Sequence, residues 1–146
     1  MSWYRVAAGA GLLTLFSSPA LADWQEQLQQ QTQIKSGSSY ANMAGRGYSL
    51  VDVAKTGLLD ASASEMVTIN VPAGSQYMVM GVCDNDCLDL DLALYKDGVE
   101  LSTDVTDDDW PLLEVNPMGS GSYQIKVTMY QCSTPNCGYQ LTVWRQ

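Results

Sequence analysis

The sequence predicts an all-β domain, an antiparallel β-sandwich or jelly roll of about eight strands. From Tyr48 onward, short runs rich in Val, Ile, Leu, Tyr and Met recur, and turn residues such as Asp97-Gly98 separate them. No segment between these runs is typical of a helix, which favours antiparallel pairing in two layers. The expected strands are 48–54, 65–71, 77–83, 88–95, 99–105, 112–116, 122–131 and 138–145.

The first 22 residues have the pattern of a signal peptide. Arg5 gives a positively charged start, residues 6–16 are apolar, and Ala20-Leu21-Ala22 supplies a small-x-small cleavage site. The apolar run is too short to span a bilayer, and no second run approaches the required length. We therefore expect a secreted or periplasmic product that begins at Asp23 and has no membrane span.

The chain is expected to divide into a signal peptide (1–22), a short helix with a linker (23–47) and the β-sandwich domain (48–146). Asp23 is a suitable N-cap, and Glu26 follows three residues later as in a capping box. The polar residues 29–31 and the Gly/Ser-rich residues 35–39 then predict that this segment is only loosely attached to the sandwich.

The net charge argues against nucleic acid as a partner. The precursor has 7 Lys+Arg and 16 Asp+Glu, and residues 1–22 contain one of the basic residues and none of the acidic ones, which gives the remaining 124 residues a net charge of −10. Binding to nucleic acid depends largely on cations that neutralise phosphates, so a polyanion partner is not expected. Anionic membrane surfaces are disfavoured for the same reason.

Four cysteines lie in the part of the chain after the signal peptide. An even number of cysteines in an exported protein predicts two disulfides, and a four-thiolate zinc site is the alternative. Local pairing is consistent with the apolar pattern of the flanking strands, although three connectivities remain open. The residues are Cys83, Cys87, Cys132 and Cys137.

Three hairpins follow from the alternation of apolar residues, because a one-residue slip would turn core side chains outward. The first joins 88–95 to 99–105 through a two-residue Asp97-Gly98 turn. The second joins 77–83 to 88–95, and the third joins 122–131 to 138–145 with a bulge at Gly138. In the first hairpin Leu94 would face Leu101, and Asp91 would lie directly opposite Asp104.

The sequence offers little for catalysis. It contains no His, which removes the commonest general base and every His-ligated metal. It has no G-x-S-x-G nucleophile motif, and the expected disulfides leave no free thiol. A carboxylate-dependent hydrolase is the remaining possibility, but 124 residues leave little room for a cleft. We therefore expect a protein that is not an enzyme. These residues point to no definite cofactor.

Acidic residues are the one feature that suggests a ligand. Like charges directly opposite each other on a sheet are destabilising, so Asp91 and Asp104 are expected to need a partner. Calcium would supply it, with Asp89 and Asp107 as additional ligands. The alternative is a solvated acidic surface that keeps an exported protein soluble. The spacing of an EF-hand loop is absent.

Three aromatic residues are candidates for binding. Tyr130 and Trp144 should face outward by parity, and Trp110 lies in a loop. A contiguous strip of such side chains would stack on sugars or anchor a protein interface.

The stretch from Val67 to Trp144 resembles the bacterial pre-peptidase C-terminal domain. The similar segments are Val-Pro-Ala-Gly at 71–74, Leu-Asp-Leu-Asp-Leu-Ala-Leu-Tyr at 88–95 with its Asp-Gly turn, and Gly-Ser-Tyr-Gln-Ile-Lys-Val at 121–127. The resemblance implies a compact β-sandwich of the kind attached to secreted peptidases, some of which bind calcium and collagen. This chain departs from the pattern in its two cysteine pairs and in carrying no peptidase domain, which suggests a stand-alone variant.

These features together predict an exported, non-catalytic binding or accessory module of the bacterial envelope or extracellular space. Its expected partner is an extracellular polymer or a protein. A calcium-stabilised structural domain is the alternative.

Overall fold

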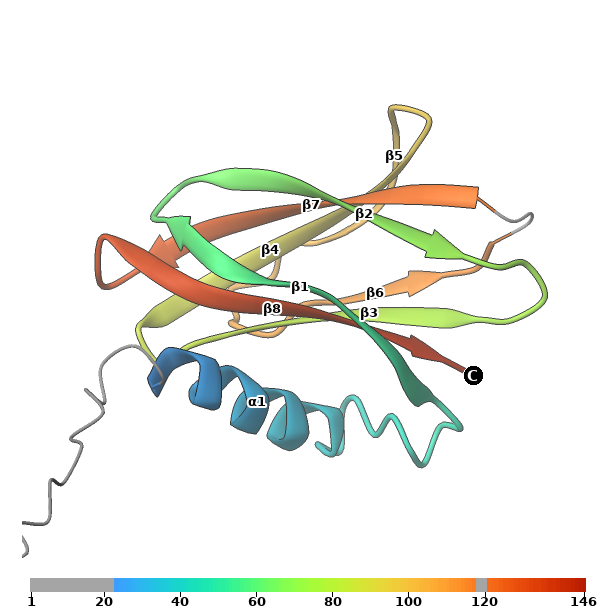
Figure 1. Ribbon diagram of the computed structural model, residues 1–146, viewed down its shortest axis with the longest axis horizontal. Coiled ribbons are helices and arrows are strands. Elements are labelled where there is room, and N and C mark those ends of the chain that lie inside the picture. The colour runs from blue at the N-terminus through green and yellow to red at the C-terminus, as the bar shows by residue number, and fades with distance from the viewer. Residues whose placement is uncertain (1–22, 118–120) are drawn as a thin grey trace, which may run out of the picture.

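In the described part of the chain, two antiparallel four-stranded sheets face each other, and one helix lies outside one of them (Figure 1). The computed structural model describes residues 23–117 and 121–146, so the expected signal peptide lies outside the described residues. The prediction of an all-β sandwich with about eight strands and a short N-terminal helix is confirmed. The elements are α1 (Asp23–Ser36), β1 (Ser49–Asp60), β2 (Ser64–Val71), β3 (Tyr77–Cys83), β4 (Cys87–Lys96), β5 (Val99–Asp104), β6 (Leu112–Val115), β7 (Gly121–Cys132) and β8 (Asn136–Arg145).

Strand β1 is longer than the strand expected at 48–54. It continues to Asp60 because it follows β8 along its whole length. Register shifts between Leu50 and Asp52 and between Val53 and Lys55 each place an extra residue in β1. These irregularities break the alternation of side chains that marks a strand in the sequence.

The order of strands is β1-β8-β3-β6 in one sheet, here called the helix-side sheet, and β2-β7-β4-β5 in the other, here called the open sheet. Strands β3 and β4 therefore lie in different sheets, and so do β7 and β8. Two of the three expected hairpins are wrong for this reason. Met129 and Leu141, for example, both lie in the core between the sheets rather than side by side in one sheet.

The β4–β5 hairpin is confirmed, with a corrected register. Lys96 pairs with Val99 around the Asp97-Gly98 turn, whose residues have φ of 51° and 78°, as a type I′ turn requires. A register shift then follows, so that Leu94 pairs with Ser102 rather than with Leu101. The bulge expected at Gly138 is absent, because Gly138 pairs in regular register with Leu58.

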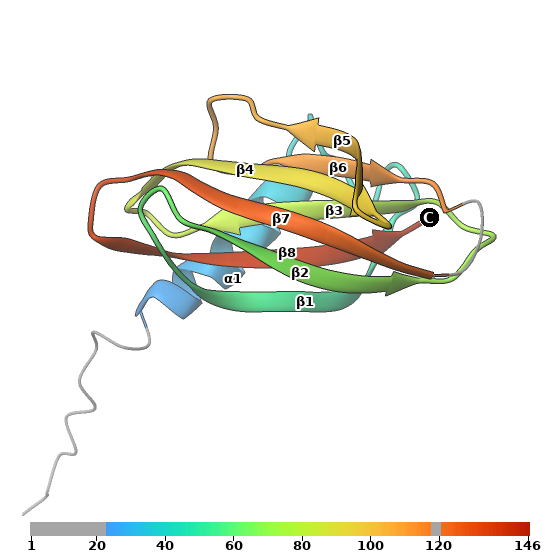
Figure 2. The ribbon, with the colours of Figure 1, turned by 90° about the horizontal axis from the view of Figure 1, so that it is seen from above.

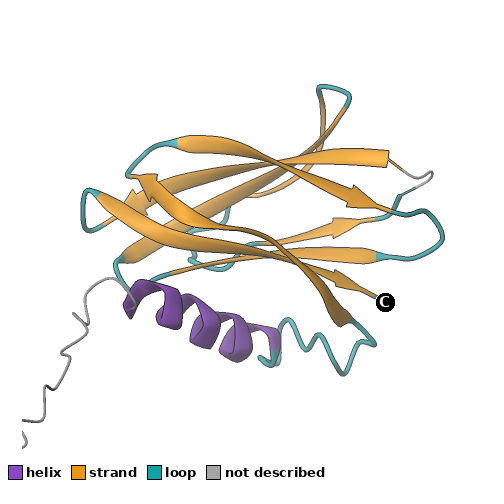
Figure 3. Ribbon diagram, viewed as in Figure 1, coloured by secondary structure: helices purple, strands orange, loops and turns teal. Residues whose placement is uncertain are grey.

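Helix α1 and the segment after it form a third layer on the helix-side sheet (Figures 2 and 3). Leu28 in the helix and Met43 in the following segment are buried against Met78, Met80 and Val82 of β3. Every residue of β3 is buried, since one face meets the core between the sheets and the other meets this layer. The expectation of a loosely attached segment is therefore wrong.

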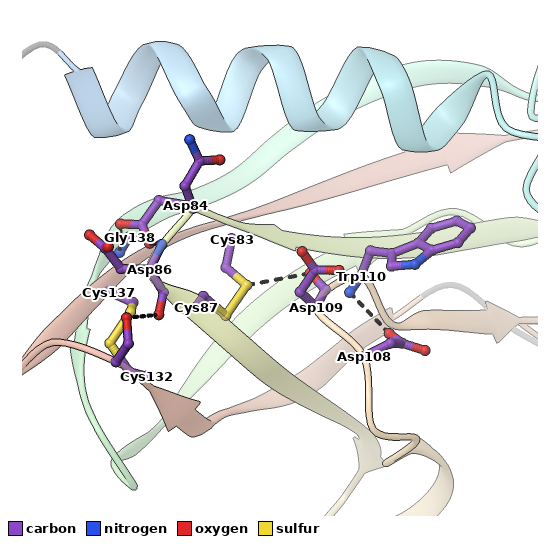
Figure 4. The surroundings of a disulfide bond; sticks show 12 residues. Cys83, Asp84, Asp86, Cys87, Asp108, Asp109, Trp110, Cys132, Cys137 and Gly138 are labelled. Carbon is purple, nitrogen blue, oxygen red and sulfur yellow. Dashed lines mark hydrogen bonds between the residues drawn. A yellow bond between two sulfur atoms is a disulfide. The ribbon is translucent and has the colours of Figure 1, made fainter.

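The two disulfides have the expected local pairing, Cys83–Cys87 and Cys132–Cys137. They do not close hairpins, however, because each one joins the two sheets at the same end of the sandwich (Figure 4). Cys87 and Cys132 are also direct partners in the β4–β7 ladder, so the two bridges lie next to each other. In the described part of the chain, no helix has the length and apolar character needed to cross a bilayer.

Candidate functional site

From Leu90 onward, β4 directs its leucines inward, whereas Leu88 near its start is 52% exposed. Leu90 and Leu92 are buried in the core between the sheets, and Asp89 and Asp91 alternate with them on the outer face of the open sheet. The backbone N–H of Leu90 donates to the carbonyl of Asp108, 2.9 Å away. The segment after β5 therefore runs beside β4 and brings a second group of acidic residues close to the first.

Asp104 does not lie opposite Asp91, contrary to the expected register. The shift near Leu101 places Asp104 opposite Leu92. Its carboxylate is also engaged by the loop that follows, because it accepts hydrogen bonds from the backbone N–H of Thr106 (3.3 Å) and of Leu112 (2.9 Å). Asp104 thus fastens the connection between β5 and β6.

Asp108 has a similar structural role, and Asp107 does not. The carboxylate of Asp108 accepts a hydrogen bond from the backbone N–H of Trp110, 3.0 Å away. The side chain of Thr106 lies 2.7 Å from Asp104 Oδ1 and 2.9 Å from Asp108 Oδ2, which ties the two carboxylates into one turn. Asp107 is exposed between them, and its charge acts on both Asp89 and Asp91.

Asp89 and Asp91 form a pair of neighbouring carboxyl groups with unusual electrostatics. Asp89 is 5% exposed, and burial together with the charges of Asp91, Asp107 and Asp108 raises its pKa to about 6. The pKa of Asp91 is also raised, first by burial and then by the charge of Asp104. One oxygen of each carboxyl group, Oδ1, is buried without a hydrogen-bond partner. Buried polar atoms are rarely left unpaired, so these two require an explanation.

The structure thus divides the four acidic residues expected to bind calcium. Asp89 and Asp91 lie together, Asp107 faces them from the exposed loop, and the carboxylate of Asp104 is occupied by backbone donors. Within residues 23–117 and 121–146, no three Asp, Glu, His or Cys side chains are arranged to hold a metal ion. Calcium binding stays a prediction.

The three candidate aromatic residues do not share one face of the molecule. Tyr130 is 63% exposed on the outer face of the open sheet. Trp110 and Trp144 are half-buried against the cluster of side chains beneath α1. Trp110 also contacts Tyr40 edge to face, with 5.5 Å between ring centroids. The structure does not join these residues into one strip.

The outer face of the open sheet carries a different set of side chains. Met66, Lys126 and Ala93 are consecutive partners across β2, β7 and β4, and Thr103 of β5 completes the row. Met66 is 47% exposed. A surface depression lined by Ser62, Thr128, Tyr130 and Gln131 adjoins this face. The sequence did not single out Met66, because assembling this face required knowing that β2 pairs with β7.

Asp84 directly follows β3, next to Cys83. It is 5% exposed, and its carboxylate accepts hydrogen bonds from the backbone N–H of Gly138 (2.6 Å) and of Asp86 (3.2 Å). Figure 4 shows Asp84, Asp86 and Gly138 together beside the disulfides. A Cβ atom at position 138 would lie 2.4 Å from Trp24, so the glycine is required by close packing of the helix. This cluster closes one end of the sandwich.

Comparisons with known proteins give structural likenesses alone. No family model matches the chain, and no curated protein matches it. Among solved structures, it is similar to PliG of Aeromonas hydrophila, a periplasmic inhibitor of g-type lysozyme, at 15% identity over 68% of this chain and 86% of that one (TM-score 0.45). It is also similar to the pre-peptidase C-terminal domain of a collagenase from Bacillus anthracis, at 13% identity over 64% of this chain and 90% of that one (TM-score 0.46).

Proposed function

We propose that this protein is an exported, non-catalytic binding module whose binding surface is the outer face of the open sheet. The observation that carries the proposal is the asymmetry of the sandwich. Helix α1 and the segment after it cover the helix-side sheet, whereas among the described residues no helix lies over β2, β7 and β4 (Figures 1 and 2). A sheet face that remains open to solvent is available to an extracellular polymer or a protein partner.

The chemistry of the open face suits such a partner. Tyr130 and Met66 expose large apolar side chains, and Lys126 lies between β2 and β4 neighbours on the same face. Tyrosine combines apolar area with a polar hydroxyl group, which is why it is enriched at interfaces. The mixture favours recognition of a glycan or peptide over burial of a large apolar ligand.

Two observations support export. The first 22 residues have the pattern of a signal peptide. All four cysteines are paired in disulfides, which persist in oxidising compartments such as the bacterial periplasm and the extracellular space.

The shortage of candidate catalytic groups in the sequence supports a non-catalytic role. The chain contains no His, and its cysteines are oxidised. The Asp89–Asp91 pair is the strongest candidate for acid–base chemistry, but Asp89 is only 5% exposed, so a substrate bond would not reach its carboxyl group. Hydrolysis that is lost on Asp91→Asn substitution would contradict this part of the proposal.

A glycan and peptide array tests the proposed binding surface. The wild-type protein should bind at least one class of ligand on the array. The Tyr130→Ala substitution should weaken this binding about tenfold or more, as expected for the loss of an aromatic anchor. Tyr40→Ala is the matched control, because Tyr40 is 71% exposed but lies on the helix side next to Trp110. Equal loss in both variants, or no retained ligand, would count against the open face.

A calcium-stabilised structural domain is the second candidate function. The buried, unpartnered oxygen atoms of Asp89 and Asp91 favour it. Calcium would stabilise the fold rather than recognise a partner. The two candidate functions therefore do not exclude each other.

A further inference from the structure

We propose that a cavity between the two sheets binds a free α-amino acid with an apolar side chain. The cavity has a volume of about 210 Å³ and lies where the edge strands β1 and β2 run along the same side of the sandwich (Figure 2). This inference goes beyond the proposed function, because the cavity lies between the sheets and not on the outer face of the open sheet.

The wall of the cavity is apolar where it meets the core. Ile69 and Val71 of β2 and Val143 of β8 line it, and all three are buried between the sheets. Val51 of β1 adds an exposed apolar side chain to the wall. An apolar cavity of about 150 Å³ holds a benzene ring. The larger cavity in this protein therefore has room for a side chain of the size of Leu.

Two opposite charges lie on the same cavity. Asp52 of β1 is the ladder partner of Val143, and Arg145 of β8 is the ladder partner of Tyr77. Because partners in an antiparallel ladder share one face of the sheet, both charged side chains leave the inner face. Both are exposed and line the cavity, and among the described residues neither takes part in an ion pair. The cavity thus presents one free anion and one free cation to a ligand.

Tyr77 adds a buried polar group to the cavity. Its side chain lines the cavity and is only 3% exposed. Within residues 23–117 and 121–146, its hydroxyl group makes no hydrogen bond, yet it is not one of the polar atoms that are sealed from solvent. A buried polar group is normally hydrogen-bonded. A ligand carboxylate held by the neighbouring Arg145 would give this hydroxyl group an acceptor.

These groups together favour a free α-amino acid over other small ligands. Such a molecule carries an ammonium group and a carboxylate on one carbon atom, beside its side chain. The ammonium group would donate to Asp52, the Arg145 guanidinium would donate to the carboxylate, and the side chain would fill the apolar part of the cavity. A simple carboxylic acid would leave Asp52 without a partner, and a simple amine would leave Arg145 without one.

Titration calorimetry of the disulfide-bonded protein tests the site with leucine and three matched compounds. Leucine should bind saturably, at one molecule per chain. Leucinamide lacks the carboxylate and N-acetyl-leucine lacks the ammonium group, so each should bind about tenfold more weakly, as expected when a charge-assisted contact is lost. Glycine should also bind about tenfold more weakly or worse, because it leaves the apolar wall uncovered.

Variants of the two charged residues should each respond to only one of these compounds. Arg145→Gln should weaken leucine binding about tenfold and leave leucinamide binding unchanged, because leucinamide offers the guanidinium no carboxylate. Asp52→Asn should weaken leucine binding similarly and leave N-acetyl-leucine binding unchanged. Lys55→Gln and Asp60→Asn are the matched controls, since they remove exposed charges of β1 that do not line the cavity. The unchanged compound also shows that each variant is folded.

Tyr77→Phe tests the hydroxyl group separately. It keeps the ring in the core and should weaken leucine binding severalfold without lowering the melting temperature. An equal affinity for leucine in this variant would contradict the role of the hydroxyl group.

Three further outcomes would overturn the inference. They are no saturable binding at millimolar leucine, binding of leucinamide or N-acetyl-leucine as tight as that of leucine, and a loss in Arg145→Gln that is equal for leucine and leucinamide.

Discussion

At the scale of single residues, the buried carboxyl group of Asp89 has a raised pKa. It lies on the outer face of β4, and the side chains near it, Asp91, Asp107 and Asp108, are all acidic. Burial and these charges both favour its protonated form, which is why its pKa rises to about 6.

This shift predicts how stability depends on pH in the metal-free protein. An unfolded Asp has a pKa of about 3.9, so the folded state binds the proton of Asp89 more tightly. The resulting stabilisation is fully present below about pH 4 and is lost as the pH rises through about 6. In chelator, the free energy of unfolding should fall by about 1.4 kcal/mol between about pH 5 and pH 7.5.

Urea unfolding at the two pH values measures this difference. Asp89→Asn should reduce the dependence markedly, although the raised pKa values of Asp91 and Asp84 contribute in the same direction. An identical pH dependence in the variant and the wild type would show that Asp89 is not responsible.

Asp84 is a second buried carboxyl group, and its role is to satisfy backbone donors. Burial raises its pKa, while its hydrogen bonds from Gly138 and Asp86 act in the opposite direction. Asp84→Ala should lower the free energy of unfolding by about 1–3 kcal/mol, because the buried N–H of Gly138 loses its acceptor. Asp86→Ala is the control, since the Asp86 contacts described here use its backbone. Denaturant titration of the two variants should separate them.

At the scale of elements, the sequence of α1 predicts that it is a helix, but packing against β3 decides where it lies. Its sequence is rich in Gln and Leu28 is its only fully buried residue, so the sequence suggests a solvated helix. The contacts that hold it come from Met78, Met80 and Val82 of β3. These outward-facing residues are far away in sequence, which is why the attachment of the helix was not predicted.

This attachment predicts a large effect of one helix residue and none of another. Leu28→Ala should destabilise the folded protein by about 3 kcal/mol, because Leu28 is fully buried and its truncation leaves a cavity. Ile34→Ala should change the stability by less than about 0.5 kcal/mol, because Ile34 is 63% exposed in the same helix. Thermal melting compares the two. Equal effects would indicate that the helix is not docked as described.

At the scale of the whole molecule, the two disulfides hold the sheets together at one end. Each closes a small loop, so its stabilisation through chain entropy is modest, about 2 kcal/mol. Cys83→Ala/Cys87→Ala and Cys132→Ala/Cys137→Ala should each lose about this amount. Urea unfolding of the two double variants measures it, and an unchanged midpoint in either would contradict a stabilising role.

The sequence by itself determined the all-β class, seven of the eight strand positions within a few residues and the β4–β5 turn. It was consistent with local pairing of the cysteines but left three connectivities open. The features that it determined depend on short-range information: the alternation of side chains and the conformational demands of Asp97-Gly98.

Only the tertiary structure decided which strands share a sheet. Alternation identifies the inner face of β7, but apolar residues meet apolar residues both within a sheet and across the core. The sequence therefore could not distinguish a β3–β4 hairpin from two strands in opposite layers. The sequence also gives no sign of the register shift near Leu101. Because of this shift, Asp104 pairs with Leu92 and does not lie opposite Asp91. The acidic pair foreseen across a hairpin is instead formed within β4, by Asp89 and Asp91.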